Sequence, residues 1–130
     1  MIVLDTSFLI SFFNEADENH GEAVNQMKHY ESKNERFLVN EHVISETSTV
    51  LLYKTGMKKA SFFLDFIKNT ENFHPYFFGP DDFDNITGLF VKQKNQLSFA
   101  DASVIYLAAS TKSRLASFDK NQKKEFSRYS

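Results

Sequence analysis

Short apolar runs alternate along this chain with longer segments that have helical periodicity. The apolar runs have the length of buried strands, and they cover Ile2–Leu4, Phe37–Val39, Tyr76–Phe78 and Leu115–Phe118. Apolar positions recurring every three to four residues predict helices at about 7–13, 20–33, 41–55, 58–70, 81–95, 99–111 and 120–126. Strands that alternate with helices in this order are typical of an α/β fold with a parallel sheet.

Nothing in the sequence marks a boundary between domains. The only prolines are Pro75 and Pro80, the chain has four glycines, and it contains no repeat or low-complexity tract. We therefore expect one domain over residues 1–130. The absence of cysteine excludes disulfides and thiolate metal sites. No window is apolar enough for a membrane helix and the N-terminus does not have the pattern of a signal peptide, so we expect a cytoplasmic protein.

Four acidic residues lie in or against apolar surroundings. Asp5 ends the first predicted strand, and Asp119 follows the last one. Asp101 lies in the first turn of the most apolar helix, in the segment ADASVIYLAAS, and Glu46 flanks the apolar arc of the third helix. A buried carboxylate is costly unless hydrogen bonds or a cation compensate it, so each of these positions needs an explanation.

Taken singly, each acid has a structural explanation. Asp is a favoured N-cap, and Ser98 with Asp101 matches a capping box. Taken together, they indicate more, because ligands of parallel sheets bind beyond the carboxyl ends of the strands, where Asp5 and Asp119 are expected. Several carboxylates at one edge are tolerable around a hard divalent cation, and a site without His or Cys suits Mg²⁺ or Mn²⁺ better than Zn²⁺.

Four ordered motifs resemble the PIN-domain ribonucleases, particularly the small VapC-type toxins. They are IVLDTSFLISFF, HVISETSTVLL, LSFADASVIYLAAS and LASFDK, and together they span essentially the whole chain. In this resemblance Asp5, Glu46, Asp101 and Asp119 match the four acids of the family in order. Thr6 and Ser117 match hydroxyl positions that commonly support such a site.

The resemblance implies a three-layer α/β/α fold with a central twisted parallel sheet. It also implies an endonuclease that cleaves RNA with Mg²⁺ or Mn²⁺, a homodimer, and inhibition by a cognate antitoxin protein. Our hypothesis is that Asp5 and Asp101 hold Mg²⁺ directly, Asp119 holds it directly or through water, and Glu46 orients the attacking water. One departure concerns the fourth acid, since Lys and amide residues follow Asp119 where the family often has an aromatic residue or another acid.

Two other functional classes are compatible with an α/β chain of this length. A phospho-acceptor receiver domain needs adjacent acids after its first strand, whereas Asp5 is followed by Thr6. A catalytically silent PIN-like module that binds RNA or acts as a scaffold remains the alternative. The net charge of −2 does not by itself indicate a nucleic-acid partner, although basic side chains could form a phosphate path near the site: Lys112, Arg114, Lys120, Lys123, Lys124 and Arg128.

Overall fold

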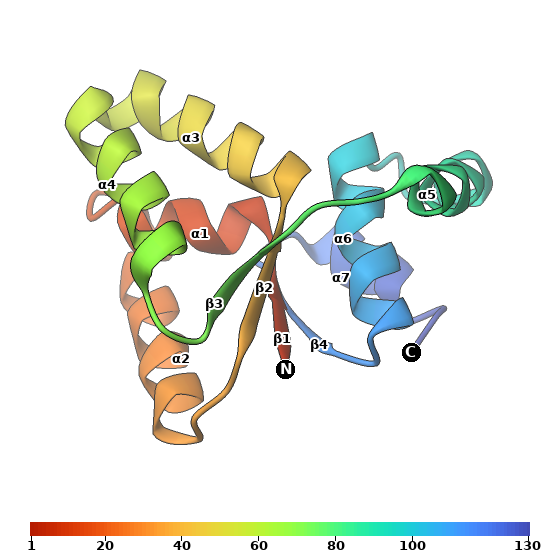
Figure 1. Cartoon of the computed structure of the whole chain (residues 1–130), viewed down its shortest axis with the longest axis horizontal. Coiled ribbons are helices and arrows are strands. Elements are labelled where there is room, and N and C mark those ends of the chain that lie inside the picture. The colour runs from red at the N-terminus through yellow and green to blue at the C-terminus, as the bar shows by residue number, and fades with distance from the viewer.

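A four-stranded parallel sheet runs through the middle of the molecule (Figure 1). The computed structural model describes residues 1–130. The strands lie in the order β3-β2-β1-β4, with β1 at Ile2–Leu4, β2 at Phe37–Asn40, β3 at Phe73–Tyr76 and β4 at Arg114–Ala116. In the register, Ile2 is opposite both Phe37 and Arg114, and β3 aligns Phe73 with Phe37.

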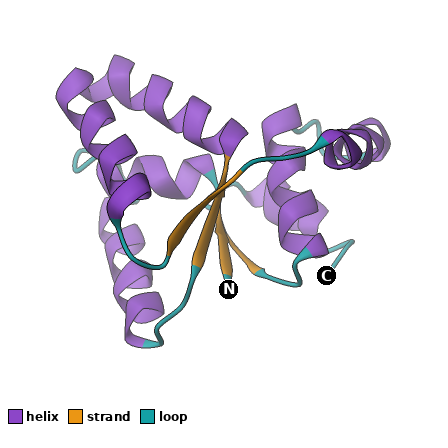
Figure 2. Cartoon of the chain, in the orientation of Figure 1, coloured by secondary structure: helices purple, strands orange, loops and turns teal.

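Seven helices cover the two faces of this sheet. They are α1 (Thr6–Phe13), α2 (His20–Ser32), α3 (Glu41–Thr55), α4 (Met57–Asn69), α5 (Pro80–Lys92), α6 (Phe99–Ser110) and α7 (Lys120–Phe126). In Figure 2 the helices α1 to α4 lie on one side of the strands, and α5 to α7 lie on the other, with α5 farthest from the sheet. The predicted α/β/α arrangement with a parallel central sheet is confirmed.

Two predicted strands are displaced from their true positions. β3 lies at 73–76 rather than 76–78, so it contains Pro75. Proline has no N–H to donate, but β3 is an edge strand, where one unpaired side of the backbone tolerates it. β4 lies at 114–116 rather than 115–118, because Phe118 leaves the sheet and its N–H donates to the Ser7 hydroxyl (2.9 Å).

Phenylalanine dominates the packing between the sheet and the helices α1 and α4. Phe13 of α1 contacts Phe63 and Phe66 of α4 edge-on, with ring centroids 5.2 Å apart in both pairs. The three residues of β1 are fully buried, as expected of an inner strand covered on both faces. This core fixes the end of β1, and so the position of Asp5.

The end of β2 is tied to a helix on the opposite side of the sheet. Asn40 caps α3, since its Oδ1 accepts from the N–H groups of His42 (2.9 Å) and Val43 (3.1 Å). Its Nδ2 donates to Ser103 of α6 (3.1 Å). The starts of α3 and α6 are therefore held at one edge of the sheet. No helix in the structure combines the length and apolar character needed to cross a bilayer.

Candidate active site

Asp5 lies directly after β1 and caps the N-terminus of α1. Its Oδ2 accepts from the N–H (3.1 Å) and the hydroxyl (2.7 Å) of Ser7, and from the Ser117 hydroxyl (3.3 Å). Its Oδ1 accepts from Nε2 of Gln122 (3.0 Å). The residue is only 3% exposed. Hydrogen bonds therefore compensate the burial of this carboxylate, and every donor is uncharged.

Asp101 lies in the first turn of α6, where it forms a capping box with Ser98. The Ser98 N–H donates to Oδ2 of Asp101 (3.1 Å), and the Asp101 N–H donates to the Ser98 hydroxyl (3.0 Å). Oδ1 of Asp101 has no hydrogen-bond partner. Burial raises the pKa of Asp101, and the negative charges of Asp5 and Asp119 raise this pKa further, against the hydrogen bonds from Ser98 that lower it. This carboxyl is thus within electrostatic reach of two other acids.

Asp119 follows β4 after two residues and caps α7. Its Oδ1 accepts from the N–H groups of Asn121 (2.9 Å) and Gln122 (3.1 Å), while Oδ2 has no partner. The turn before it is fixed by Ser117, whose hydroxyl accepts the Asp119 N–H (3.0 Å). The capping explanation therefore holds for all three aspartates. Capping also brings them together, because α1, α6 and α7 all begin at the carboxyl edge of the sheet.

Glu46 is placed differently from the three aspartates. It lies in the second turn of α3, it is exposed, and it does not contribute to the pKa shift of Asp101. It stands four residues after His42, so the two side chains share one side of the helix. The His42 ring contacts Phe99 at the start of α6, with centroids 5.7 Å apart. The structure therefore does not bring Glu46 together with the three aspartates.

Two residues of this site were missed by the sequence analysis. Ser7, rather than Thr6, provides the hydroxyl bonded to Asp5, and the buried Thr6 Oγ1 has no hydrogen-bond partner. Gln122 is completely buried, and its Nε2 reaches both Asp5 and the backbone carbonyl of Asp101 (3.3 Å). The sequence holds one signal for Gln122, since an amide three residues after an N-cap Asp points back toward the cap.

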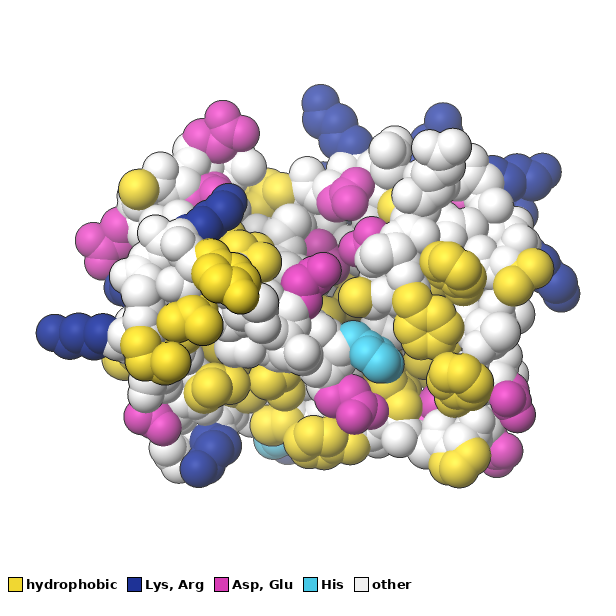
Figure 3. Space-filling model, turned by 90° about the horizontal axis from the view of Figure 1, so that it is seen from above, with side chains coloured by type: hydrophobic (Ala, Val, Ile, Leu, Met, Phe, Trp, Pro, Cys, Tyr) yellow, Lys and Arg dark blue, Asp and Glu magenta, His cyan; other side chains and the backbone are white.

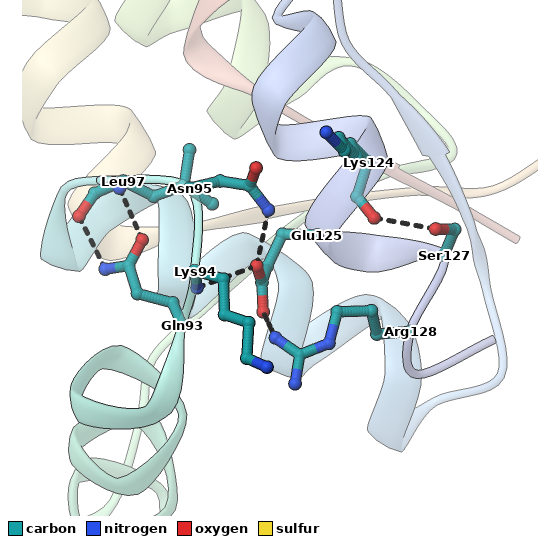
Figure 4. A network of polar contacts seen from close by, with 8 residues as sticks. All are labelled: Gln93, Lys94, Asn95, Leu97, Lys124, Glu125, Ser127 and Arg128. Carbon is teal, nitrogen blue, oxygen red and sulfur yellow. Dashed lines mark hydrogen bonds and ion pairs between the residues drawn. The ribbon is translucent and has the colours of Figure 1, made fainter.

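The loop that leads into α6 is held by a buried carboxylate of α7 (Figure 4). Glu125 accepts from the Lys94 N–H (3.1 Å) and the Asn95 side chain (2.6 Å). It also pairs with Arg128 at 2.6 Å. Burial works to raise the pKa of Glu125, but these hydrogen bonds and the charge of Arg128 outweigh it and lower the pKa. Gln122 and Glu125 thus use one face of α7 to position the acids and the loop before Asp101.

Comparison with known families now identifies the fold. The family model described as the PIN domain matches residues 2–126. The chain belongs to the PIN domain family. A solved structure similar to this chain is that of VapC20 of Mycobacterium tuberculosis, described as a toxin that cleaves the sarcin–ricin loop. The TM-score is 0.84 at 22% sequence identity, over 95% of this chain and 94% of VapC20. The curated proteins include no match to this chain.

The donor atoms of this PIN domain suit a hard divalent cation. No three of its Asp, Glu or His side chains lie close enough together to coordinate one ion jointly. Mg²⁺ does not need such a group, because it binds through one or two carboxylates and keeps several of its waters. The free oxygens Oδ1 of Asp101 and Oδ2 of Asp119, with Asp5 beside them, are of the kind that Mg²⁺ and Mn²⁺ prefer.

Proposed function

We propose that this PIN domain is a Mg²⁺-dependent endoribonuclease, with Mn²⁺ as a substitute, and the toxin of a type II toxin–antitoxin pair. One observation carries the proposal: hydrogen bonds of Ser117 and Gln122 link Asp5 to the backbones of Asp119 and Asp101 at the carboxyl edge of the sheet. No cationic side chain forms an ion pair with any of these three acids. Carboxylates that lie close together and form no ion pair with a Lys or Arg side chain are suited to binding a divalent cation.

In this proposal, Asp5 and Asp101 hold the metal directly and Asp119 holds it directly or through water. When bound, the ion would lower the pKa of a coordinated water and stabilise the charge that develops on the scissile phosphate. Gln122, Ser7 and Ser117 fix the Asp5 carboxylate in one orientation. Glu46, exposed on α3, is the group proposed to orient the attacking water and accept its proton.

The phosphate path needs a revision relative to the sequence analysis. Arg114 forms an ion pair with Glu35, and Arg128 pairs with Glu125, so both guanidinium groups are engaged. Lys120, Lys123 and Lys124 are exposed on α7, directly after Asp119. These three lysines are the proposed contacts to RNA phosphates beside the acids.

The toxin role rests on the likeness to VapC20 and on the PIN fold itself. By this likeness we propose an RNA substrate, a cognate antitoxin protein, a homodimer and a cytoplasmic location. One observation favours the alternative, a catalytically silent PIN-like module that binds RNA or acts as a scaffold. This observation is that no three acidic side chains lie close enough together to coordinate one metal ion.

A cleavage assay separates the two functions. Wild-type protein is incubated with structured RNA in Mg²⁺, in Mn²⁺ and in EDTA, and the new ends are analysed. We expect cleavage only with metal, giving 5′-phosphate and 3′-hydroxyl ends because water is the nucleophile. D5N should lose cleavage while it stays folded, since Asn is as good an N-cap as Asp for α1.

The matched control is D65N, which changes an exposed acid on α4 and should cleave as wild type does. Cleavage that persists in EDTA, cyclic phosphate ends, or full activity of D5N would each contradict the proposed mechanism. Absence of cleavage in wild type under all metal conditions would favour the silent module.

A further inference from the structure

Asn40 is a completely buried amide at the carboxyl end of β2. The parallel register pairs Val3 of β1 with Leu38 of β2. Asp5 and Asn40 each follow two residues later, so they leave neighbouring strands at the same level of the sheet. Because a buried amide is costly without hydrogen-bond partners, the partners of Asn40 show what it holds in place beside the acids.

The two ends of the Asn40 side chain bond to two different helices. Its Oδ1 accepts from two N–H groups in the first turn of α3, so this end caps that helix. Its Nδ2 donates to the hydroxyl of Ser103 at 3.1 Å, and this hydroxyl donates in turn to the carbonyl of Ala100 at 2.5 Å. Ser103 is completely buried as well, and Ala100 directly precedes Asp101. A chain of hydrogen bonds therefore runs from the cap of α3 to the turn of α6 that carries Asp101.

The bond from Asn40 to Ser103 is the only hydrogen bond between the start of α3 and α6. The rings of His42 and Phe99 also join these helices, with centroids 5.7 Å apart, but an apolar contact has no preferred direction. Figure 3 looks down on this face, where acidic side chains lie in the middle, between the half with α3 and α4 and the half with α5. The hydrogen bond thus fixes how α3 is placed relative to α6 at the acidic edge.

We propose that Asn40 and Ser103 are positioning residues, which place Glu46 of α3 relative to a metal held at Asp101 of α6. This inference rests on the proposed ribonuclease function. Glu46 does not lie with the three aspartates, so its approach to a metal-bound water depends on where α3 is held. A general base acts only within hydrogen-bond reach of its proton, directly or through one water, and a misplacement of about 1 Å can lower the rate about 100-fold. Neither Asn40 nor Ser103 needs to touch metal or RNA for this role.

Two variants break the bond from opposite sides. S103A removes the acceptor and leaves the cap of α3 intact, whereas N40S keeps a capping hydroxyl that is too short to reach α6. For each, kcat and KM are measured with RNA, and affinity is measured with Mn²⁺ alone. We expect kcat to fall by roughly 10- to 100-fold, with KM and Mn²⁺ affinity close to wild type, because the aspartates and the lysines of α7 keep their places. The matched control is S110A, whose hydroxyl donates only within α6, to the Leu107 carbonyl (3.2 Å), and it should match wild type.

Combining S103A with E46Q separates a positioning role from a general loss of structure. If the bond acts through Glu46, S103A should lower the kcat of E46Q no further, whereas independent effects would multiply. If S103A does not fold, the same comparison is made with N40S.

Wild-type kcat in S103A and N40S overturns the inference, and if D5N is inactive in the same assay the proposed function stands. Multiplying losses in E46Q/S103A also overturn it, as does a loss of Mn²⁺ affinity as large as the loss of kcat, because the bond would then serve the fold or the metal site rather than Glu46. Wild-type activity of E46Q overturns both the inference and the role of Glu46, while the metal dependence of cleavage is judged separately by EDTA and D5N.

Discussion

Replacing Gln122 by methionine tests how the acids are positioned. Methionine has nearly the volume of glutamine but no hydrogen-bond donor. In Q122M the Asp5 carboxylate loses the donor at 3.0 Å, and the Asp101 carbonyl loses the one at 3.3 Å. The Asp5 carboxylate would keep the hydrogen bonds from Ser7 and Ser117 on its other oxygen, so it could turn about that side.

Two opposing terms set the change in unfolding free energy. Loss of a hydrogen bond to a charged group costs about 1.5–3 kcal/mol. The Oε1 of Gln122 is buried without a partner, and removing such an orphaned acceptor returns about 1–3 kcal/mol. The lost bond to the Asp101 carbonyl adds about 0.5–1.5 kcal/mol, so the net change in unfolding free energy lies between roughly neutral and a loss of about 3.5 kcal/mol. Cleavage should suffer more, because a residue behind a metal ligand typically controls about 10- to 100-fold in metal affinity or activity.

The assay pairs urea denaturation with cleavage kinetics at saturating metal. We expect Q122M to fold, with a loss of unfolding free energy within this range, but to have a lower kcat with little change in KM, because the RNA contacts remain. The control Q26M changes a Gln on α2 that bonds only to Glu22 (3.1 Å), and it should match wild type in both measurements. If Q122M has wild-type kcat, or if it fails to fold while Q26M folds, the positioning role of Gln122 is refuted.

Two further predictions concern buried polar groups. Because hydrogen bonds and Arg128 lower the folded-state pKa of Glu125, its ionised form stabilises the fold above the unfolded-state pKa, and this stability is lost as pH falls through the lowered value. E125Q should therefore lose about 1–3 kcal/mol in urea unfolding at pH 7 and approach wild type in acid, and an equal loss at both pH values would contradict this. T6V should keep or slightly raise the melting temperature, since the buried Thr6 hydroxyl makes no hydrogen bond that the substitution could remove. A fall of several degrees would contradict this and would mean that the hydroxyl does have a partner.

The sequence was sufficient for the architecture because periodicity reports burial directly. The all-apolar run of β1, the helical spacing in α3 and the long apolar segment of α6 each placed an element correctly. The two displaced strands, β3 and β4, are the edge strands of the sheet, where proline and exposed residues are tolerated. Pro75 pairs with Val39 inside β3, and exposed Arg114 opens β4 opposite Ile2.

The site was harder to predict, because the sequence does not show which of several neighbouring polar side chains forms a given hydrogen bond. Thr6 and Ser7 both follow Asp5, and only the first turn of α1 decides that the Ser7 hydroxyl faces Asp5 and Ser117. Gln122 looked like part of a solvated run of Lys and amide residues. Its spacing from the N-cap Asp119 is one local signal, but its burial depends on α7 packing back against the end of β1 and the start of α6, and that packing is not local.

Binding of Mn²⁺, followed by electron paramagnetic resonance, tests the central claim most directly, because it needs neither RNA nor turnover. The signal of free Mn²⁺ should fall when wild-type protein is added, and D65N should lower it equally. D101N should leave most of the free signal in place, because its affinity for Mn²⁺ should be lower by roughly tenfold or more. If wild-type protein leaves the free Mn²⁺ signal unchanged, or if D101N binds the ion as tightly as wild type, then the three converging aspartates do not form a metal site.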